Sequence, residues 1–577
     1  MRIAVTQFAT SLNSQENLAS CLRMIDDTAV CKPQLIVLPE YCNSHCYSVQ
    51  LNSEQGNYLD HNQAWDEAIS LDGTFMVSVA ERAKRHNCYI ALNVTVRRDI
   101  ARTHQNPAIK SNISITSCLI SPTGELVQQH SKSQLSNKEN EFFISATNTA
   151  QLSSTPFGTI ALVDANDSTS FKNSRNHAMT GAQLLCQSTS TFLRDNSEIF
   201  AAARSSENNL FVAIANKVTP FESAITRENE SLNSTCLEEY LANVCQSQII
   251  ATDGTVLAEI AHNKTGFVFA DIDLSYVGLS EKIRTDGTNV KAQLRPELYQ
   301  DANVKVASCQ SNKIPDTANV AIFATYKDNE QAIEDVCFYI ENNLSDIIQL
   351  PELFFVSDKS ITHDSARIIA VEDLCQQLVK QVSAMLRPFQ YVCTSIIIDG
   401  VHQAVLINEH GIFAQQPQLH FCQRYQWTAL GDVLNIIELP LEQGNIKLAM
   451  LTADDANIPE LVHVAGLKGI HLLLAPFDIQ SANEVEFSLL AQAAKHKFCV
   501  VAATREKSLK KASLKNGSHD KTEKSTGFIA SLAREQELSS VLHSKKFNGY
   551  LNKPIVKQQY GKITKALIHP VLAHKCF

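Results

Sequence analysis

Two glutamates each follow a proline at the end of a long aliphatic run. Glu40 stands in LIVLPEYC, residues 35–42, and Glu352 stands in the near copy IIQLPELF, residues 347–354. A carboxylate at the end of a buried strand can move protons as a general base and acid. It can also be structural, held by a partner charge or by backbone N–H groups, because an unpaired buried charge is costly. Both roles are considered for both glutamates.

The two stretches belong to a longer internal repeat. RIAVTQFAT, starting at Arg2, is followed by a helix-length segment and the first Pro-Glu pair, and NVAIFATYKDNEQAIEDVCFYIENNLSDIIQLPE, starting at Asn319, repeats this order. Further along, each half is expected to contain a strand, a tight turn closed by Gly124 or Gly411, and a returning strand. Later apolar runs also recur in the same order. This pattern predicts a tandem duplication.

Each half alternates short β-type runs with amphipathic segments of helical length. Examples are SVAERAKRH in the first half and AIEDVCFYIEN in the second. Such alternation predicts layered α/β domains with a largely buried sheet. The expected organisation is one domain over residues 1–300, a polar linker over 301–316 and a second domain over 317–577.

The composition is that of a globular protein with more than one core. The chain has 577 residues, of which 44% are hydrophobic, and a net charge of -10, which argues against a nucleic-acid partner. No apolar run approaches the ~20 residues that a membrane-spanning helix needs, and the start MRIAVTQFAT does not resemble a signal peptide. The cytoplasm is the expected location. The cysteines show no zinc-site spacing, so neither a metal nor a cofactor is expected.

The order of the elements resembles the carbon-nitrogen hydrolase, or nitrilase, superfamily. The resemblance occurs once per half and is clearest in the first, in VLPEYC, the hairpin ending near Lys132, GTIALVDAND, GAQLL, ARSSENNLFVAIAN, SQIIATDGTVLAEI and LRPELY. It implies an αββα sandwich in each half, and therefore two tandem nitrilase-like domains. Because members of this superfamily commonly pair such domains as dimers, it also implies an intrachain pseudo-dimer.

In that superfamily each site uses a glutamate, a lysine and a cysteine. The thiolate attacks a nitrile or amide carbon, the carboxylate moves protons, and the ammonium stabilises the developing negative charge. The resemblance assigns the first two roles to Glu40 and Lys132, and it matches Glu139 to a second carboxylate that often follows the lysine. The cysteine position, two residues before Asp167, holds Ala165.

The second half departs further from the family pattern. Glu352 is retained, but Gln418 stands at the lysine position and Arg424 at the position of the second carboxylate. Ala453, two residues before Asp455, occupies the cysteine position. Because Glu352 lacks its lysine, we expect it to form a structural ion pair with Arg424.

Alanine at both cysteine positions rules out covalent catalysis by the route of the family. Removing the nucleophile of a well-characterised hydrolase lowers kcat on the order of 10⁶-fold. Replacement by another residue has to be considered, although a free cysteine often packs as a small hydrophobic side chain. The candidates for such a replacement are Ser168, Thr169, Ser170 and Cys186.

Three functions are compatible with these residues. The leading one is a catalytically degenerate relative that binds a small amide, nitrile or carboxylate in the first half. The alternative is an active hydrolase of non-peptide C–N bonds, which needs a hydroxyl, thiol or water within about 3 Å of Glu40. The third is a structural or regulatory subunit that binds protein partners and has closed pockets. The sequence alone does not decide between catalysis and binding.

Overall fold

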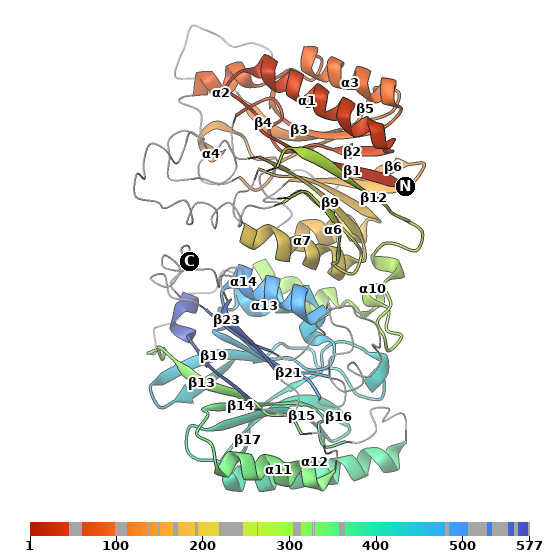
Figure 1. Cartoon of the computed structure of the whole chain (residues 1–577). Helices are drawn as coiled ribbons and strands as arrows, with labels where there is room; N and C mark the ends of the chain where they lie inside the picture. The colour runs from red at the N-terminus through yellow and green to blue at the C-terminus, as the bar shows by residue number, and fades with distance from the viewer. Residues whose placement is uncertain are drawn as a thin grey trace. The chain divides into compact units, whose positions relative to one another are not determined.

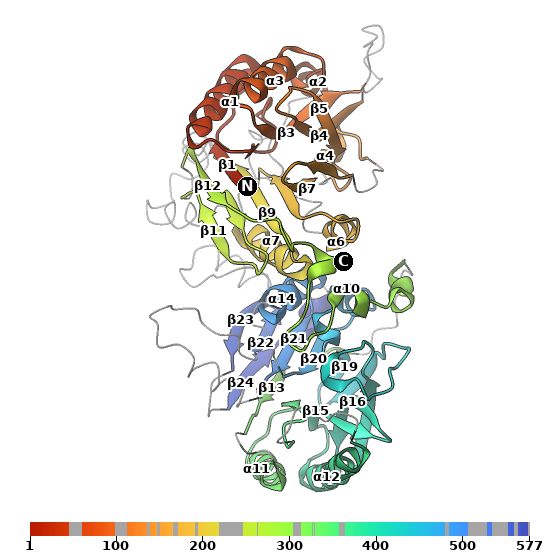
Figure 2. The same cartoon turned by 90° about the vertical axis from the view of Figure 1, so that its right-hand side faces the viewer.

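The structure is a computed structural model of the chain. It describes residues 1–45, 61–98, 112–135, 139–146, 151–164, 171–190, 194–218, 246–261, 264–303, 313–325, 327, 329–356, 364–478, 484–505, 528–532, 552–558 and 563–574. These residues form two compact units, which divide between Lys282 and Ile283 (Figures 1 and 2). Each unit is described by itself.

The unit boundary differs from the predicted boundary at residue 300. Residues 283–303 belong to the second unit because their side chains bond to it. The Gln293 amide donates to the carbonyl of Phe421 at 2.7 Å, and Arg295 Nη1 donates to the carbonyl of Leu419 at 2.8 Å. Polar contacts of this kind between segments far apart in sequence cannot be read from composition.

The first unit consists of two packed half-sheets with helices outside. Its strands are β1 (Arg2–Phe8), β2 (Leu35–Val37), β3 (Tyr89–Arg97), β4 (Ile113–Ile120), β5 (Leu126–Ser131), β6 (Ser153–Thr155), β7 (Gly158–Asp164), β8 (Leu184–Ser188), β9 (Phe211–Lys217), β10 (Gln248–Ile250), β11 (Val256–Glu259) and β12 (Gly266–Asp271). Its longer helices are α1 (Ser14–Thr28), α2 (His61–Glu67), α3 (Thr74–His86), α6 (Phe171–Met179) and α7 (Arg194–Asn208), and α4 (Glu139–Phe142) is a single turn.

The strand order makes this unit an αββα sandwich. One half-sheet has the order β5-β4-β3-β2-β1-β12, the other has the order β6-β7-β8-β9-β10-β11, and a short β1–β9 pairing joins them. Apolar side chains of both halves, such as Val5 and Leu162, form the core between them. Helices α1 and α3 cover the outer face of the first half, and α6 and α7 lie against the other half (Figures 1 and 2).

The predicted amphipathic segments form helices for the expected reason. Helix α3 buries Phe75, Met76, Val79 and Ala83, whose spacing of three and four residues places them on one face. The helix ends at Asn87, which adopts the left-handed conformation at φ 50° and closes the last turn. The SVAERAKRH prediction is confirmed.

The second unit has the same strand order as the first. Its strands are β13 (Ala318–Ile322), β14 (Ile347–Glu352), β15 (Tyr391–Ile398), β16 (Val401–Asn408), β17 (Gly411–Pro417), β18 (Ile437–Leu441), β19 (Gly444–Met450), β20 (Leu472–Pro476), β21 (Cys499–Ala503), β22 (Phe528–Leu532), β23 (Asn552–Lys557) and β24 (Thr564–Ile568). They form sheets of order β17-β16-β15-β14-β13-β24 and β18-β19-β20-β21-β22-β23. Common descent of the two halves stays a prediction.

Helices cover both outer faces of this second sandwich. The helices are α10 (Val290–Gln293), α11 (Glu330–Glu341), α12 (Ser365–Met385), α13 (Pro459–Leu467) and α14 (Leu490–His496). Helices α11 and α12 pack on the β14 sheet, and α13 and α14 pack on the β20 sheet. None of the described helices is both long and apolar enough to cross a membrane.

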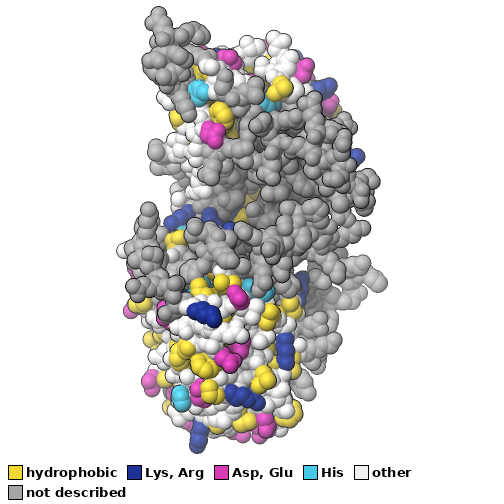
Figure 3. Space-filling model, turned by 90° about the vertical axis from the view of Figure 1, so that its left-hand side faces the viewer, with side chains coloured by type: hydrophobic (Ala, Val, Ile, Leu, Met, Phe, Trp, Pro, Cys, Tyr) yellow, Lys and Arg dark blue, Asp and Glu magenta, His cyan; other side chains and the backbone are white. Residues whose placement is uncertain are grey.

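On the face shown in Figure 3, Lys and Arg side chains are interspersed with Asp, Glu and hydrophobic ones.

Both predicted glycine turns are present. Gly124 joins β4 to β5 with φ 79°, and Gly411 begins β17 with φ 115°. Only glycine adopts these backbone angles without strain. The turns matter for function because β5 and β17 lead into Lys132 and Gln418.

Candidate active site

A tight turn after β2 places Glu40 inside the first sandwich. The backbone N–H of Glu40 donates to the carbonyl of Thr189 at 3.2 Å, and the next residue, Tyr41, adopts a left-handed φ of 53°. The amide oxygen of Asn93, on β3, accepts the N–H of Tyr41 at 3.0 Å. These bonds hold an unfavourable backbone conformation, and the Glu40 side chain is fully buried.

Glu40, Lys132 and Glu139 come together as the sequence predicts. Lys132 Nζ lies 2.7 Å from Glu40 Oε1 and 2.7 Å from Glu139 Oε1. The Tyr41 hydroxyl also donates to Glu139 Oε1. All three side chains of the cluster are at most 4% exposed, so the ion pairs are shielded from water.

Burial and the neighbouring charges shift the pKa values of Lys132 and Glu40. Burial alone disfavours the charged Lys132 ammonium, but the surrounding carboxylates of Glu40, Glu139 and Asp164 raise its pKa well above the ordinary value. Burial, together with the nearby Glu139 carboxylate, raises the pKa of Glu40, although Lys132 and Ser190 oppose the shift. A cation therefore lies beside a carboxyl group with increased proton affinity, an arrangement that suits proton transfer to a reacting group.

Two further groups belong to the surroundings of the cluster, Ser190 beside Glu40 and Asp164, whose charge acts on Lys132. The Ser190 hydroxyl, just beyond β8, donates to Glu40 Oε2 at 2.7 Å. Asp164, the last residue of β7, accepts hydrogen bonds from Asn93 at 2.9 Å and Ser117 at 2.5 Å. Neither Ser190 nor Asp164 was predicted as a site residue from the sequence.

Of the positions considered for a nucleophile in the first unit, the structure describes only Cys186. Ala165, Ser168, Thr169 and Ser170 lie outside the described residues. Cys186 is 2% exposed, and it packs in the apolar core between the half-sheets. Burial raises the pKa of its thiol, so Cys186 is a core residue rather than a nucleophile.

The second unit repeats the turn but not the cluster. The N–H of Glu352 donates to the carbonyl of Phe477 at 3.1 Å, Leu353 has a left-handed φ of 38°, and the hydroxyl of Ser395 accepts the N–H of Leu353 at 3.2 Å. Ser395 thus acts as Asn93 does in the first unit. The local fold that presents the glutamate is shared by the two units.

The carboxylate of Glu352 is bound by neutral groups. Its Oε1 accepts the hydroxyl of Tyr425. Its Oε2 accepts the N–H of Ala453 at 2.8 Å and the hydroxyl of Thr452 at 3.3 Å. Ala453 itself has a left-handed φ of 51°. Protein groups therefore occupy both oxygens of Glu352.

Gln418 occupies the backbone position of Lys132 but makes other contacts. Its N–H donates to the carbonyl of His402 at 3.0 Å, as the N–H of Lys132 donates to that of Ile115 at 2.9 Å. Its amide nitrogen donates to the carbonyl of His420 at 2.7 Å, and its amide oxygen lies 2.9 Å from His402 Nδ1. Gln418 therefore supplies no charge to Glu352.

The predicted Glu352–Arg424 ion pair is wrong. Arg424 Nη2 contacts Asp454 Oδ1 at 3.1 Å, and Asp454 Oδ2 also lies 3.3 Å from Arg284 Nε. In this segment Tyr425, one position along the chain, contacts Glu352 instead. The short helical turn at residues 423–425 decides which side chain faces inward, and the sequence does not reveal that turn.

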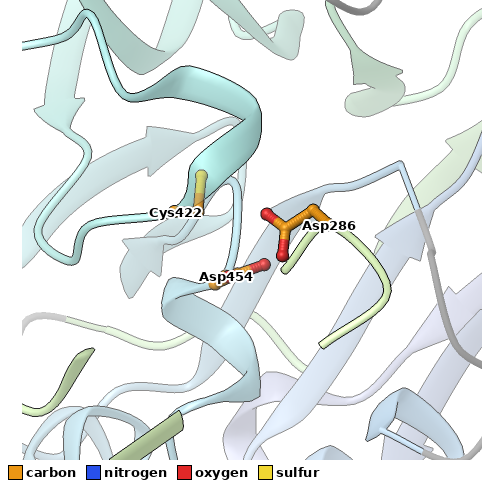
Figure 4. Close-up of side chains that lie close together, drawn as sticks. All are labelled: Asp286, Cys422 and Asp454. Carbon is orange, nitrogen blue, oxygen red and sulfur yellow. The ribbon is translucent and has the colours of Figure 1, made fainter. Parts of the chain in front are cut away.

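Three oxygen and sulfur ligands lie close together in this region. Figure 4 shows the side chains of Asp286, Cys422 and Asp454 close together, and one ligand atom from each lies within 4.8 Å of the others. Arg284 and Arg424 balance the two carboxylates, and burial, followed by the Asp454 charge, raises the pKa of the Cys422 thiol. The cluster is therefore charge-balanced without a metal ion.

Replacing Tyr425 with phenylalanine is expected to lower the free energy of unfolding of the second unit by about 1.5–3 kcal/mol, because the buried Glu352 carboxylate loses a donor. Tyr391→Phe is the matched control, since its hydroxyl donates to the neutral carbonyl of Pro440 at 2.8 Å. Its loss is expected to be about 1 kcal/mol. Urea denaturation followed by Trp427 fluorescence in a Trp65→Phe background measures both. Equal losses would contradict the importance of the Tyr425–Glu352 bond.

Known proteins are similar to part of this chain. A family model described as carbon-nitrogen hydrolase matches residues 2–282. The NitFhit protein of C. elegans is 22% identical, with a TM-score of 0.37. The match covers 48% of this chain and 61% of that chain, so this chain spans about three fifths of NitFhit. A variant of the Nesterenkonia AN1 amidase from the nitrilase superfamily is 19% identical, with a TM-score of 0.35, and the match covers 47% of this chain and 90% of that chain.

Proposed function

Because residues 2–282 belong to the carbon-nitrogen hydrolase family, we propose that the first unit binds a small amide, nitrile or carboxylate beside Glu40 and Lys132 without hydrolysing it. The observation that carries the proposal is the buried Glu40–Lys132–Glu139 cluster in a chain with alanine at the cysteine position. An ammonium has three N–H donors, and the two carboxylates take two of those of Lys132. The third suits the oxygen or nitrile nitrogen of a ligand.

The second unit has a structural role in this proposal. Tyr425, Thr452 and Ala453 already satisfy the Glu352 carboxylate, and Gln418 is bonded to His402 and His420. A ligand would have to displace these buried hydrogen bonds, each of which is costly to leave unmade. The same residue type therefore belongs to a ligand-binding site in the first unit, as Glu40, and to a structural hydrogen-bond network in the second, as Glu352.

Calorimetric titration with propionamide, propionitrile and propionate tests the proposal. Glu40→Gln is expected to weaken binding of the best of these probes by at least about tenfold, because it removes the partner that orients Lys132. Glu352→Gln, the same change in the second unit, is expected to leave the affinity unchanged. Absence of saturable binding in the natural protein would contradict the proposal and favour a role through protein contacts.

A second candidate function is hydrolysis with Ser190 as nucleophile. The observation that favours it is the 2.7 Å hydrogen bond from the Ser190 hydroxyl to Glu40, which is the distance at which a base removes a proton. Glu40 would take that proton while Ser190 Oγ bonds to the amide carbon. The C–N bond would then break, and the proton would pass to the leaving amine. Water, deprotonated by Glu40, would cleave the resulting ester and restore the Ser190 hydroxyl.

Ammonia release from a panel of amides separates the two functions. If Ser190 is the nucleophile, Ser190→Ala lowers the rate by at least about 10³-fold. Ser188→Ala is the control, because that buried hydroxyl donates to the carbonyl of Leu38 and does not contact Glu40. An acyl group on Ser190, detected by mass spectrometry, would support hydrolysis. Activity that survives Ser190→Ala would exclude this nucleophile.

A further inference from the structure

A cavity of about 600 Å³ lies at β5, the edge strand of the first unit. Its described lining comes from β4, β5 and residues 144–146, together with Arg98 and Gln151. Side chains of a strand alternate between faces, so Ser131 contributes to the cavity while the next residue, Lys132, points to Glu40. The cavity is therefore distinct from the candidate active site.

Arg98 is bound only to neutral groups in the described part of the chain. Its Nε donates to Ser114 Oγ at 2.7 Å, and its Nη2 donates to Thr116 Oγ1 at 3.0 Å and Ser131 Oγ at 2.6 Å. The three hydroxyls are buried and linked to one another at 2.9 and 3.0 Å. They fix the guanidinium in one orientation, and no described residue accepts a hydrogen bond from Nη1.

Among its described lining residues, the cavity holds a single charged side chain, Arg98. Arg2 and Arg82 each contact a carboxylate, whereas the ion pairs of the described residues include none for Arg98. None of the described lining residues is acidic. The cavity thus presents one positive charge that the described residues do not balance, surrounded by hydroxyl and amide groups.

We propose that this cavity binds a small polar molecule through a carboxylate on Arg98. Its volume falls in the range of small-molecule sites, ~300–1,000 Å³. A carboxylate gains a charge-assisted hydrogen bond from the guanidinium, which is stronger than a neutral one. One guanidinium balances one carboxylate, whereas a phosphate, with a charge of about -1.5 to -2, would need a second cation. The site goes beyond the proposed function, because it does not use Glu40 or Lys132.

Ligand-observed NMR with butyrate tests this site in the full chain. Arg98→Gln is expected to weaken butyrate binding by at least about tenfold, and Arg98→Lys, which keeps the charge but loses the fork of donors, by a smaller factor. Arg97→Gln is the matched control, since the adjacent Arg97 side chain bonds to the carbonyls of Trp65 and Asp66 and does not line the cavity. Its affinity for butyrate is expected to be unchanged.

Further arms separate this site from the candidate active site. Glu40→Gln is expected to retain the Arg98-dependent butyrate signal, even if binding beside Lys132 is lost. Equal binding by Arg98→Gln and Arg97→Gln would overturn the proposal, and so would equally effective displacement of butyrate by inorganic phosphate. If Arg98→Gln does not fold, Arg98→Lys decides: unchanged affinity for butyrate in that variant would contradict a role for the guanidinium fork.

Discussion

Replacing Lys132 with methionine is expected to lower the free energy of unfolding of the first unit by about 3–5 kcal/mol. The ammonium lies between the buried carboxylates of Glu40 and Glu139, 2.7 Å from each. Removing it leaves negative charges without water and without a cation. The matched change in the second unit, Gln418→Met, removes only neutral hydrogen bonds, so we expect a loss of about 1–2 kcal/mol there.

The two tryptophans of the chain separate the two units in this experiment. Trp65 is 6% exposed in the core of the first unit, and Trp427 packs against the core of the second. Urea denaturation of Lys132→Met in a Trp427→Phe background reports on the first unit, and Gln418→Met in a Trp65→Phe background reports on the second. Two domains need not unfold in one step, so separate reporters are required. Equal losses in the two variants would contradict a buried charge cluster around Lys132.

The same pair of proteins gives a defined pH dependence. The folded pKa of Lys132 is raised, so its contribution to stability is complete below its ordinary value of 10.5 and is lost as the pH rises through the folded value. Burial raises the pKa of Glu40, and loss of Lys132 raises it further. The stability of Lys132→Met therefore falls as the pH rises above the ordinary glutamate value of 4.5. The difference from the natural protein is expected to be large at pH 8 and to shrink toward pH 4.

Replacing Ala165 with cysteine is expected to raise ammonia release from small amides by at least about 10³-fold over the natural chain. Ala165 follows the last residue of β7 in sequence, and the described part of the site already holds a carboxyl group with a raised pKa and an ammonium. A thiol there would supply the missing nucleophile. Adding Glu40→Gln to this variant is expected to abolish the gain, because the base is lost.

Ala453→Cys is the matched control in the second unit. Its thiol would lie beside Glu352, whose oxygens are bound by Tyr425 and by the backbone of residue 453, with Gln418 in place of a lysine. No gain in ammonia release is expected from this variant. Equal gains in both cysteine variants would indicate nonspecific thiol chemistry. A folded but silent Ala165→Cys variant would show that the first site lacks more than its nucleophile.

The fold was predictable because local patterns and the internal repeat agree. Pro-Glu pairs mark the ends of β2 and β14, and glycine turns mark the hairpins before Lys132 and Gln418. The family order then linked Glu40, Lys132 and Glu139, and the structure brings their side chains together. Chain order suffices for Glu40 and Lys132 because each follows a strand that the sequence defines, and Glu139 begins the short helix α4 soon after Lys132.

Side-chain partners across the sandwich were not predictable. Ser190 contacts Glu40 over a separation of 150 residues, and no local pattern links the two. Tyr425 was missed in favour of Arg424, because a difference of one residue in a short turn decides which side chain reaches Glu352 and which reaches Asp454. Tyr41 was within reach, since it follows Glu40 directly, but its contact with Glu139 depends on a left-handed backbone that sequence rarely reveals.

The bonds of Glu352 have a consequence for motion in the second unit. The carboxylate belongs to β14, in one sheet, whereas Thr452 and Ala453 follow β19, in the other. The glutamate thus fastens the two layers of the sandwich together. The oxygens of Glu352 therefore become accessible to a ligand only when the two layers separate. Local opening there requires loss of much of the apolar core between the layers. A residue type that can transfer protons elsewhere thus holds two sheets together here, and the backbone N–H of Ala453 is one of its partners in the opposite sheet.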